Sequence, residues 1–174
     1  MKQNNHAGKK QQSASMDDGE YMDIVMINAL LESLYTIFST MVRVTIQPGV
    51  PEPKQDNMAK GAVSSLIGMK AAGASGSIAI SLSQPTISEI SLSLLGYEIT
   101  NVGNEAVDLT GELTNMLVGG AKRILAEKGY DFDMQTPQLL LGEGHVIEHH
   151  YPGQTVLLPI KIKQGEFYLE LNFV

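Results

Sequence analysis

Apolar residues recur at helical spacing in some stretches of the chain and in short runs or alternation in others. Helical spacing predicts two long helices and, between them, a short helix that starts at Pro85 and Thr86 and stops at Gly96. Short apolar runs bounded by glycine or proline predict strands. The predicted helices lie within residues 22–41, 84–98 and 104–129, and the predicted strands within 42–53, 59–83 (two strands), 137–150, 155–164 and 166–174.

This order of elements is helix, three strands, short helix, long helix, three strands. Strands joined by short turns favour antiparallel pairing. The sequence therefore predicts an α/β (α+β) fold in which long helices pack on an antiparallel sheet. The last strand is rich in β-forming residues and runs to Val174, so it is expected to be an open edge and to join two copies of the chain as a dimer.

A weak internal repeat accompanies this pattern. Asn28, Glu32 and Tyr35 on the first long helix have the same spacing as Asp108, Glu112 and Asn115 on the second. Each helix is followed by three predicted strands, which predicts two duplicated helix-plus-three-strand halves. The acid and the amide at the last two positions occur together in the second half alone.

Composition limits the class of protein. The chain has 174 residues, with a net charge of -7, and its isoelectric point is about 5.0, which argues against a nucleic-acid or anionic-membrane surface. It has no cysteine, so disulfides and thiol catalysis are excluded. Residues 1–20 are nearly free of large apolar side chains and are expected to be a disordered leader, followed by one domain over 21–174. Because no apolar run approaches ~18 residues and no signal peptide is recognised, a cytoplasmic protein without a membrane segment is predicted.

The second long helix carries the most informative polar residues. At about 100° per residue, Asp108, Glu112 and Asn115 fall within about 60° of one another, with Gly119 between them. We call these four residues the polar helix face. On spacing alone, such a face can be ordinary solvated helix surface. Apolar residues occupy the rest of the helix circumference: Val107, Leu109, Leu113, Met116, Leu117, Val118, Ile124 and Leu125.

A second candidate site is histidine-rich. His145, Glu148 and His149 form an H-x-x-E-H pattern, followed by His150. This pattern binds zinc when it lies on a helix, where both imidazoles share a face. Here it lies between a glycine-rich turn and Tyr151, which predicts a strand end or loop. The main interpretation is a polar loop, and a metal hydrolase is the weaker alternative.

The segment DLTGELTN, residues 108–115, has a more specific meaning together with Pro137. Asp108, Glu112 and Asn115, followed by 21 residues and then Pro137, resemble the signature of the CheC/CheX/FliY phosphatases of bacterial chemotaxis. The segments GELTNMLVGGAK, QTPQLLLGEGH and GEFYLELNF are also similar to CheX. The resemblance spans residues 22–174 and is closest to CheX, because the first half of the repeat lacks the amide.

The resemblance implies a function in two-component signalling: a hydrolase that dephosphorylates the aspartyl phosphate of a CheY-type response regulator. It implies that Asn115 orients the attacking water and that Glu112 pairs with the regulator's active-site lysine. Asp108 and Pro137 would support the helix face. Gly119 would either leave room for the partner or allow close packing inside the domain.

The resemblance also implies that no cofactor belongs to the chain itself, since the magnesium ion belongs to the regulator. It implies a homodimer, because CheX proteins are homodimers. The alternative function is a non-catalytic module of the same fold that binds a regulator or a motor component.

Overall fold

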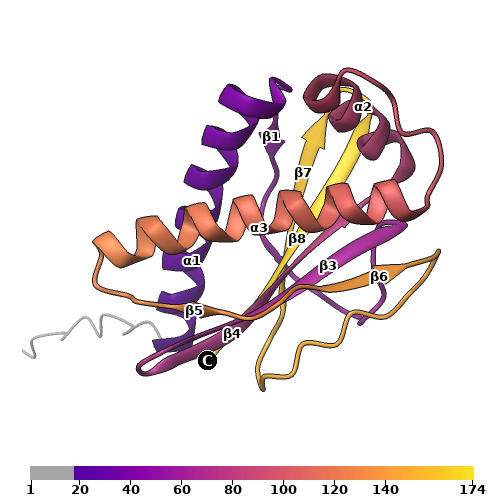
Figure 1. The fold of residues 1–174 in the computed structure, drawn as a ribbon. Coiled ribbons are helices and arrows are strands. Elements are labelled where there is room, and N and C mark those ends of the chain that lie inside the picture. Colours follow the sequence, from indigo (N-terminus) through magenta and orange to yellow (C-terminus); the bar gives the residue numbers. More distant parts are fainter. Residues whose placement is uncertain (1–17) are drawn as a thin grey trace, which may run out of the picture.

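The computed structural model describes residues 18–174, with side chains from Tyr21 onwards, and it places the helices against one face of an antiparallel sheet (Figure 1). The expected leader, residues 1–20, lies outside the described residues except for its last three positions. Those three positions already belong to the first helix, which begins at Asp18.

The helices agree with the hydrophobic pattern. The elements are α1 (Asp18–Ile37), continued by a π-helical turn η1 (Phe38–Val42), then α2 (Gln84–Leu95) and α3 (Asn104–Glu127). The short helix α2 ends as expected, with Gly96 in the left-handed conformation at φ 81°. Helix α3 ends two residues before Gly129, whose φ of 91° prevents its continuation.

The strands form one eight-stranded antiparallel sheet. Six of them follow the order β1-β7-β8-β4-β3-β5, while β2 also pairs with β7 and β6 also pairs with β3. Their bounds are β1 (Gln47–Pro48), β2 (Glu52–Pro53), β3 (Val63–Ala71), β4 (Ala74–Leu82), β5 (Asp133–Met134), β6 (Gln138–Leu141), β7 (Val156–Ile162) and β8 (Gly165–Phe173).

The predicted open edge at the C-terminus is wrong. Strand β8 lies in the middle of the sheet, paired with β7 on one side and with β4 on the other. Strong β-propensity does not distinguish an edge strand from a central one. In the structure, residues on both faces of β8 are buried from Leu169 to Phe173, which is typical of a central strand. The final strand therefore cannot form the expected dimer seam.

Two other strand predictions are corrected. The segment 137–150 is a strand only over Gln138–Leu141, because Gly142 and Gly144 adopt positive φ values of 115° and 66° and interrupt it. Strand β5 was not expected from the sequence, and the predicted strand within 42–53 is reduced to the two-residue pieces β1 and β2.

The topology confirms the duplication, with four strands in each half where three were predicted: β1–β4 after α1 and β5–β8 after α3. Each half has a long helix, then short strands, then a hairpin: β3–β4 in the first half and β7–β8 in the second. The hairpins join through β4 and β8 at the centre of the sheet. The short strands are exchanged, since β1 and β2 pair with β7 of the second half and β5 and β6 pair with β3 of the first. Helix α2 follows the first half and has no counterpart in the second.

The main core lies between the helices and the sheet. Helices α1 and α3 cross in close contact, where Ser33 Oγ donates a 2.8 Å hydrogen bond to the Leu117 carbonyl. Contrary to the expectation from the sequence, the stretch Tyr21–Val42 has the length and hydropathy of a membrane span, although core helices of soluble proteins meet the same test. Its Met26, Leu30 and Leu34 side chains are fully buried against this core.

Candidate functional site

The polar helix face lies on the outer side of α3. Asp108, Glu112 and Asn115 are exposed, while Leu113 and Leu117 on the opposite side are completely buried. The spacing of these residues at 3.6 per turn produces this separation. The structure therefore brings the three sequence-predicted polar residues together on one accessible surface.

These polar side chains are free to bind a partner. Within residues 18–174, neither carboxylate nor the Asn115 amide makes a hydrogen bond or ion pair with another residue of the chain. Solvent must satisfy them in the free protein, so a partner protein can replace that water without breaking contacts inside the domain.

Two adjacent glycines of α3 have different surroundings. A Cβ atom built on Gly119 has no atom within 4 Å apart from its chain neighbours and the backbone of its own helix, whereas one built on Gly120 lies 2.2 Å from Ser33 Oγ. Gly120 therefore permits the close approach of α1, and Gly119 has no packing role inside the domain. Of the two expected explanations for Gly119, internal packing is excluded.

Pro137 lies directly before β6 and is partly buried. Strand β6 runs beside α3, and a Cβ atom on Gly111 would lie 3.3 Å from Leu139 Cδ2. Pro137 thus begins the strand that packs against the helix carrying the polar face.

An apolar groove adjoins the polar helix face. Its volume is ≈ 440 Å³, and Asp108 and Glu112 form part of its wall. Its other walls come from η1, the end of α2, the following loop and α3. The remaining lining residues are Met41, Leu94, Leu95, Tyr97, Ile99, Glu105, Leu109 and Met116. We call it the α2–α3 groove. Sequence analysis missed it, although Leu95 and Tyr97 on either side of a helix-ending glycine are a usable signal.

Helix α1 presents the corresponding positions of the repeat. Asn28 and Glu32 are exposed, and Tyr35 is half exposed. Tyr35 lines a separate hollow with Phe38 and Arg43. The repeat is therefore retained as an exposed helix face, without the amide found in α3.

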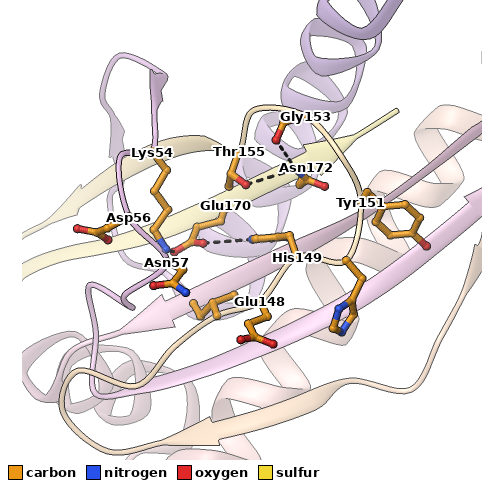
Figure 2. Close-up of a pocket in the computed structure, with 12 residues that line it drawn as sticks. Lys54, Asp56, Asn57, Glu148, His149, Tyr151, Gly153, Thr155, Glu170 and Asn172 are labelled. Carbon is orange, nitrogen blue, oxygen red and sulfur yellow. Dashed lines mark hydrogen bonds and ion pairs between the residues drawn. The ribbon is translucent and has the colours of Figure 1, made fainter.

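A second polar cluster lies on the other face of the sheet (Figure 2). Side chains alternate along β8, so Leu169 and Leu171 face the helices while Glu170 and Asn172 face away from them. Figure 2 shows Lys54 and His149 pointing towards Glu170 in a pocket of ≈ 310 Å³. We call Lys54, Ser77, His149 and Glu170 the buried cluster.

The members of the buried cluster satisfy one another. Lys54 Nζ lies 2.6 Å from Glu170 Oε1, and His149 Nε2 lies 3.2 Å from Glu170 Oε2. The other ring nitrogen, His149 Nδ1, lies 2.7 Å from Ser77 Oγ. An Nε2–H tautomer fits, since it donates to the carboxylate and accepts from the hydroxyl. The side chains of Lys54 and Glu170 are 3% and 0% exposed, so this is an internal charge pair.

A tyrosine at the same face of β8 is perturbed by its surroundings. Burial raises the pKa of the Tyr168 phenol above 10.0, and the hydrogen bond that Tyr168 Oη donates to Glu166 raises this pKa further. Tyr168 and the buried cluster were not identified from the sequence. A signal existed for Tyr168 and Glu170 alone, as polar residues at alternate positions of the otherwise apolar strand β8.

The H-x-x-E-H pattern lies in a loop, as the sequence predicted. His145 Nδ1 is 2.6 Å from the Gly142 carbonyl, whereas His149 belongs to the buried cluster. Glu148 is exposed. Across residues 18–174, no three histidine, aspartate or glutamate side chains meet in a metal-binding arrangement. The geometry therefore gives no support to the alternative of a metal hydrolase.

Comparisons with known proteins show which family the chain resembles. Residues 63–161 match the family model described as chemotaxis phosphatase CheX. A CheC-like superfamily protein from Shewanella sp. PV-4 is 42% identical, with a TM-score of 0.80 over 87% of this chain and 98% of that one. The chemotaxis protein CheX from Vibrio vulnificus is 40% identical, with a TM-score of 0.79 over 86% of this chain and 99% of that one.

A more distant structure shares the fold. It is the CheX-CheY-BeF3-Mg²⁺ complex from Borrelia burgdorferi, which is 22% identical, with a TM-score of 0.70 over 85% of this chain and 97% of that one. No curated protein matches the chain.

Proposed function

Since the chain belongs to the CheX family of chemotaxis phosphatases, we propose that it hydrolyses the aspartyl phosphate of a CheY-type response regulator through the polar helix face. The observation that carries this proposal is the state of Asp108, Glu112 and Asn115. They are exposed, unpaired within residues 18–174 and fixed on a long helix that is anchored in the core. In the hydrolysis, water oxygen bonds to phosphorus, the bond from phosphorus to the aspartyl oxygen breaks, and inorganic phosphate leaves.

Asn115 is proposed to orient the attacking water. An amide both donates and accepts hydrogen bonds, so it can hold a water molecule in line with the bond that breaks. Phosphoryl transfer depends on positioning and charge stabilisation more than on covalent chemistry from the protein. An exposed amide on a rigid helix suits this role, because the helix backbone fixes its position before the partner arrives.

Glu112 is proposed to pair with the active-site lysine of the regulator. It lies one turn before Asn115 on the same helix face, so both side chains can reach one partner site. A carboxylate bound to an ammonium group forms a charge-assisted hydrogen bond, which favours one orientation of the two proteins. Asp108 would extend the acidic surface by one further turn.

Gly119 and Pro137 are proposed to support this face. Gly119 would leave room for the regulator, which agrees with the open space at the position that a Cβ atom would occupy. Pro137 would fix the start of β6, which packs against α3. The chain is proposed to need no cofactor of its own, because magnesium would be held by the regulator.

The regulator as partner is supported by the complex from Borrelia burgdorferi, in which a CheX protein is bound to CheY with beryllofluoride and magnesium. A cytoplasmic location is proposed with it, because response regulators act there. No contact with nucleic acid or membrane is proposed, in keeping with the net charge of -7.

A homodimer is also proposed, in which the two copies do not meet through strand β8. The edge strand β6 is the better candidate, since Leu139 and Leu141 are 41% and 50% exposed. Sedimentation at micromolar concentration tests this, and a monomer would contradict it. The polar helix face must remain free in the dimer in order to admit a regulator domain.

The proposed function is tested by measuring phosphate release from a panel of phosphorylated response regulators of the same genome. We expect this protein to accelerate the release from at least one regulator at catalytic concentration. Binding without acceleration would support the non-catalytic module instead. No acceleration for any regulator would contradict the proposal.

A further inference from the structure

The α2–α3 groove is an apolar surface next to the proposed catalytic residues. Met41, Leu95 and Tyr97 are 50%, 45% and 51% exposed, although they are large and apolar. They come from η1, the end of α2 and the loop after it, and they line one continuous hollow with Asp108 and Glu112. Grouped apolar exposure of this kind is typical of a binding surface, whereas single exposed apolar residues are not.

The walls of this groove are held rigidly. The Ile99 carbonyl accepts hydrogen bonds from Gln84 Nε2 at 2.7 Å and from Ser88 Oγ at 3.0 Å. The Ile99 N–H donates to Ser91 Oγ at 2.9 Å, and Ser93 Oγ donates to the Val42 carbonyl. These contacts fasten the loop and η1 to α2. A partner that binds here therefore orders few additional residues, which favours affinity.

The charge of the groove restricts the partner. Among the described residues, the charged ones that line the groove are Glu105, Asp108 and Glu112, and none is a lysine, arginine or histidine. Complementary charge stabilises and orients a protein–protein contact. The fitting partner surface therefore combines an apolar side chain with neighbouring basic residues. A second copy of this chain, with a net charge of -7, fits this requirement poorly.

We propose that the α2–α3 groove receives an apolar side chain, flanked by lysine or arginine, from the response regulator beside its phosphorylated aspartate. This inference rests on the proposed function and extends it. Asn115 and Glu112 would act on groups common to response regulators, and the groove would select among regulators by the side chains around their phosphorylation site. Leu95 and Tyr97 would be its main binding residues.

The chain provides a matched control for this proposal. Leu92 lies on the same helix as Leu95 and is 54% exposed, but it does not line the groove. Leu95→Ala and Tyr97→Ala change exposed side chains, so the fold should tolerate both. Leu92→Ala makes the same kind of change outside the groove.

The experiment measures affinity and turnover separately, with a regulator that the wild-type protein dephosphorylates. Affinity is measured for that regulator activated by beryllofluoride and magnesium, and turnover for its phosphorylated form. We expect Leu95→Ala and Tyr97→Ala each to weaken binding and raise KM about tenfold, the scale of an interface hot spot, with a much smaller change in kcat. Leu92→Ala should match the wild type. Glu105→Lys should weaken binding most at low salt.

Wild-type affinity in both groove variants would overturn the proposal, and so would an equal loss in Leu92→Ala. A change in the sedimentation of the free protein, with regulator affinity unchanged, would assign the groove to self-association and also overturn it. These outcomes concern the groove alone and can be distinguished from a failure of the proposed function. If Asn115→Ala keeps full activity, the catalytic assignment fails whatever the groove variants do.

Discussion

The two faces of the sheet carry polar clusters in opposite states. On the helix side, Asp108, Glu112 and Asn115 are exposed and make no hydrogen bond or ion pair with each other or with the rest of residues 18–174. On the other side, Lys54 and Glu170 are almost fully buried and paired at 2.6 Å. Both sets have the composition of a functional site. Their surroundings separate them, because free polar groups can bind a partner and mutually satisfied ones hold the fold together.

The two clusters should differ in the property that changes when one of their side chains is removed. An exposed side chain without internal contacts contributes little to stability, so its removal affects binding or catalysis. A buried charge that loses its partner cannot be solvated, so its removal affects the free energy of unfolding. Variants of the two clusters should therefore separate stability from activity.

The largest effect on stability is expected from Lys54→Ala. The variant leaves the Glu170 carboxylate buried without its cation, which should lower the free energy of unfolding by about 3–5 kcal/mol. Urea unfolding followed by circular dichroism measures this change. The turnover of the folded variant should remain close to that of the wild type, because the cluster lies on the face away from α3.

Lys60→Ala is the matched control for this prediction. Lys60 pairs with Asp56 at 3.7 Å, and both side chains are largely solvated, at 40% and 50% exposed. Its loss should cost less than about 1 kcal/mol. Equal destabilisation by the two lysine variants would show that the buried cluster has no special structural role.

A smaller effect on stability is expected at the contact between α1 and α3. Gly120→Ala places a methyl group against Ser33 and displaces the hydroxyl from the Leu117 carbonyl, which should cost about 1–3 kcal/mol. Gly119→Ala meets no atom and improves helix propensity, so it should leave stability unchanged or raise it by up to ~1 kcal/mol. Thermal unfolding compares the two.

The same pair of variants tests the role of Gly119. If a regulator approaches α3 at this point, Gly119→Ala should reduce regulator affinity even though the fold is intact. Unchanged affinity for this stable variant would remove Gly119 from the partner surface.

A binding effect on the order of tenfold is expected for Glu112→Ala. The variant removes the carboxylate proposed to meet the regulator lysine, which should cost about 1.4 kcal/mol of affinity and also slow turnover. Higher salt should weaken wild-type binding more than binding of the variant. Titration calorimetry at two salt concentrations measures both effects. Glu32→Ala, at the repeat-related position of α1, is the control and should behave as wild type.

The sequence predicted the parts of the fold that depend on local pattern. Helical spacing located α1, α2 and α3, and short apolar runs bounded by glycine or proline located the strands of the two hairpins. Local pattern could not place β8 in the sheet, because pairing partners are set by contacts between distant segments. For the same reason, the exchange of short strands between the two halves was not foreseen.

The candidate sites also divide into one that local sequence spacing predicts and one that depends on contacts between distant segments. The polar helix face could be predicted, since its members lie within twelve residues on one helix. The buried cluster could not, because Lys54, His149 and Glu170 come from three distant segments. His149 was noticed for its spacing to His145, but its actual partners are Ser77 and Glu170. Spacing along a loop carries little information about contacts, whereas spacing along a helix defines a face.

The central claim is that Asn115 positions the attacking water without being needed for docking. The most direct measurement is single-turnover dephosphorylation of a cognate regulator by Asn115→Ala, together with its affinity for the beryllofluoride-activated regulator. Asn28→Ala, which removes an exposed asparagine of α1, is the control. We expect the rate to fall on the order of 10²-fold while affinity stays near that of the wild type, because the amide acts mainly in the transition state. Dephosphorylation by Asn115→Ala at the wild-type rate would contradict the account.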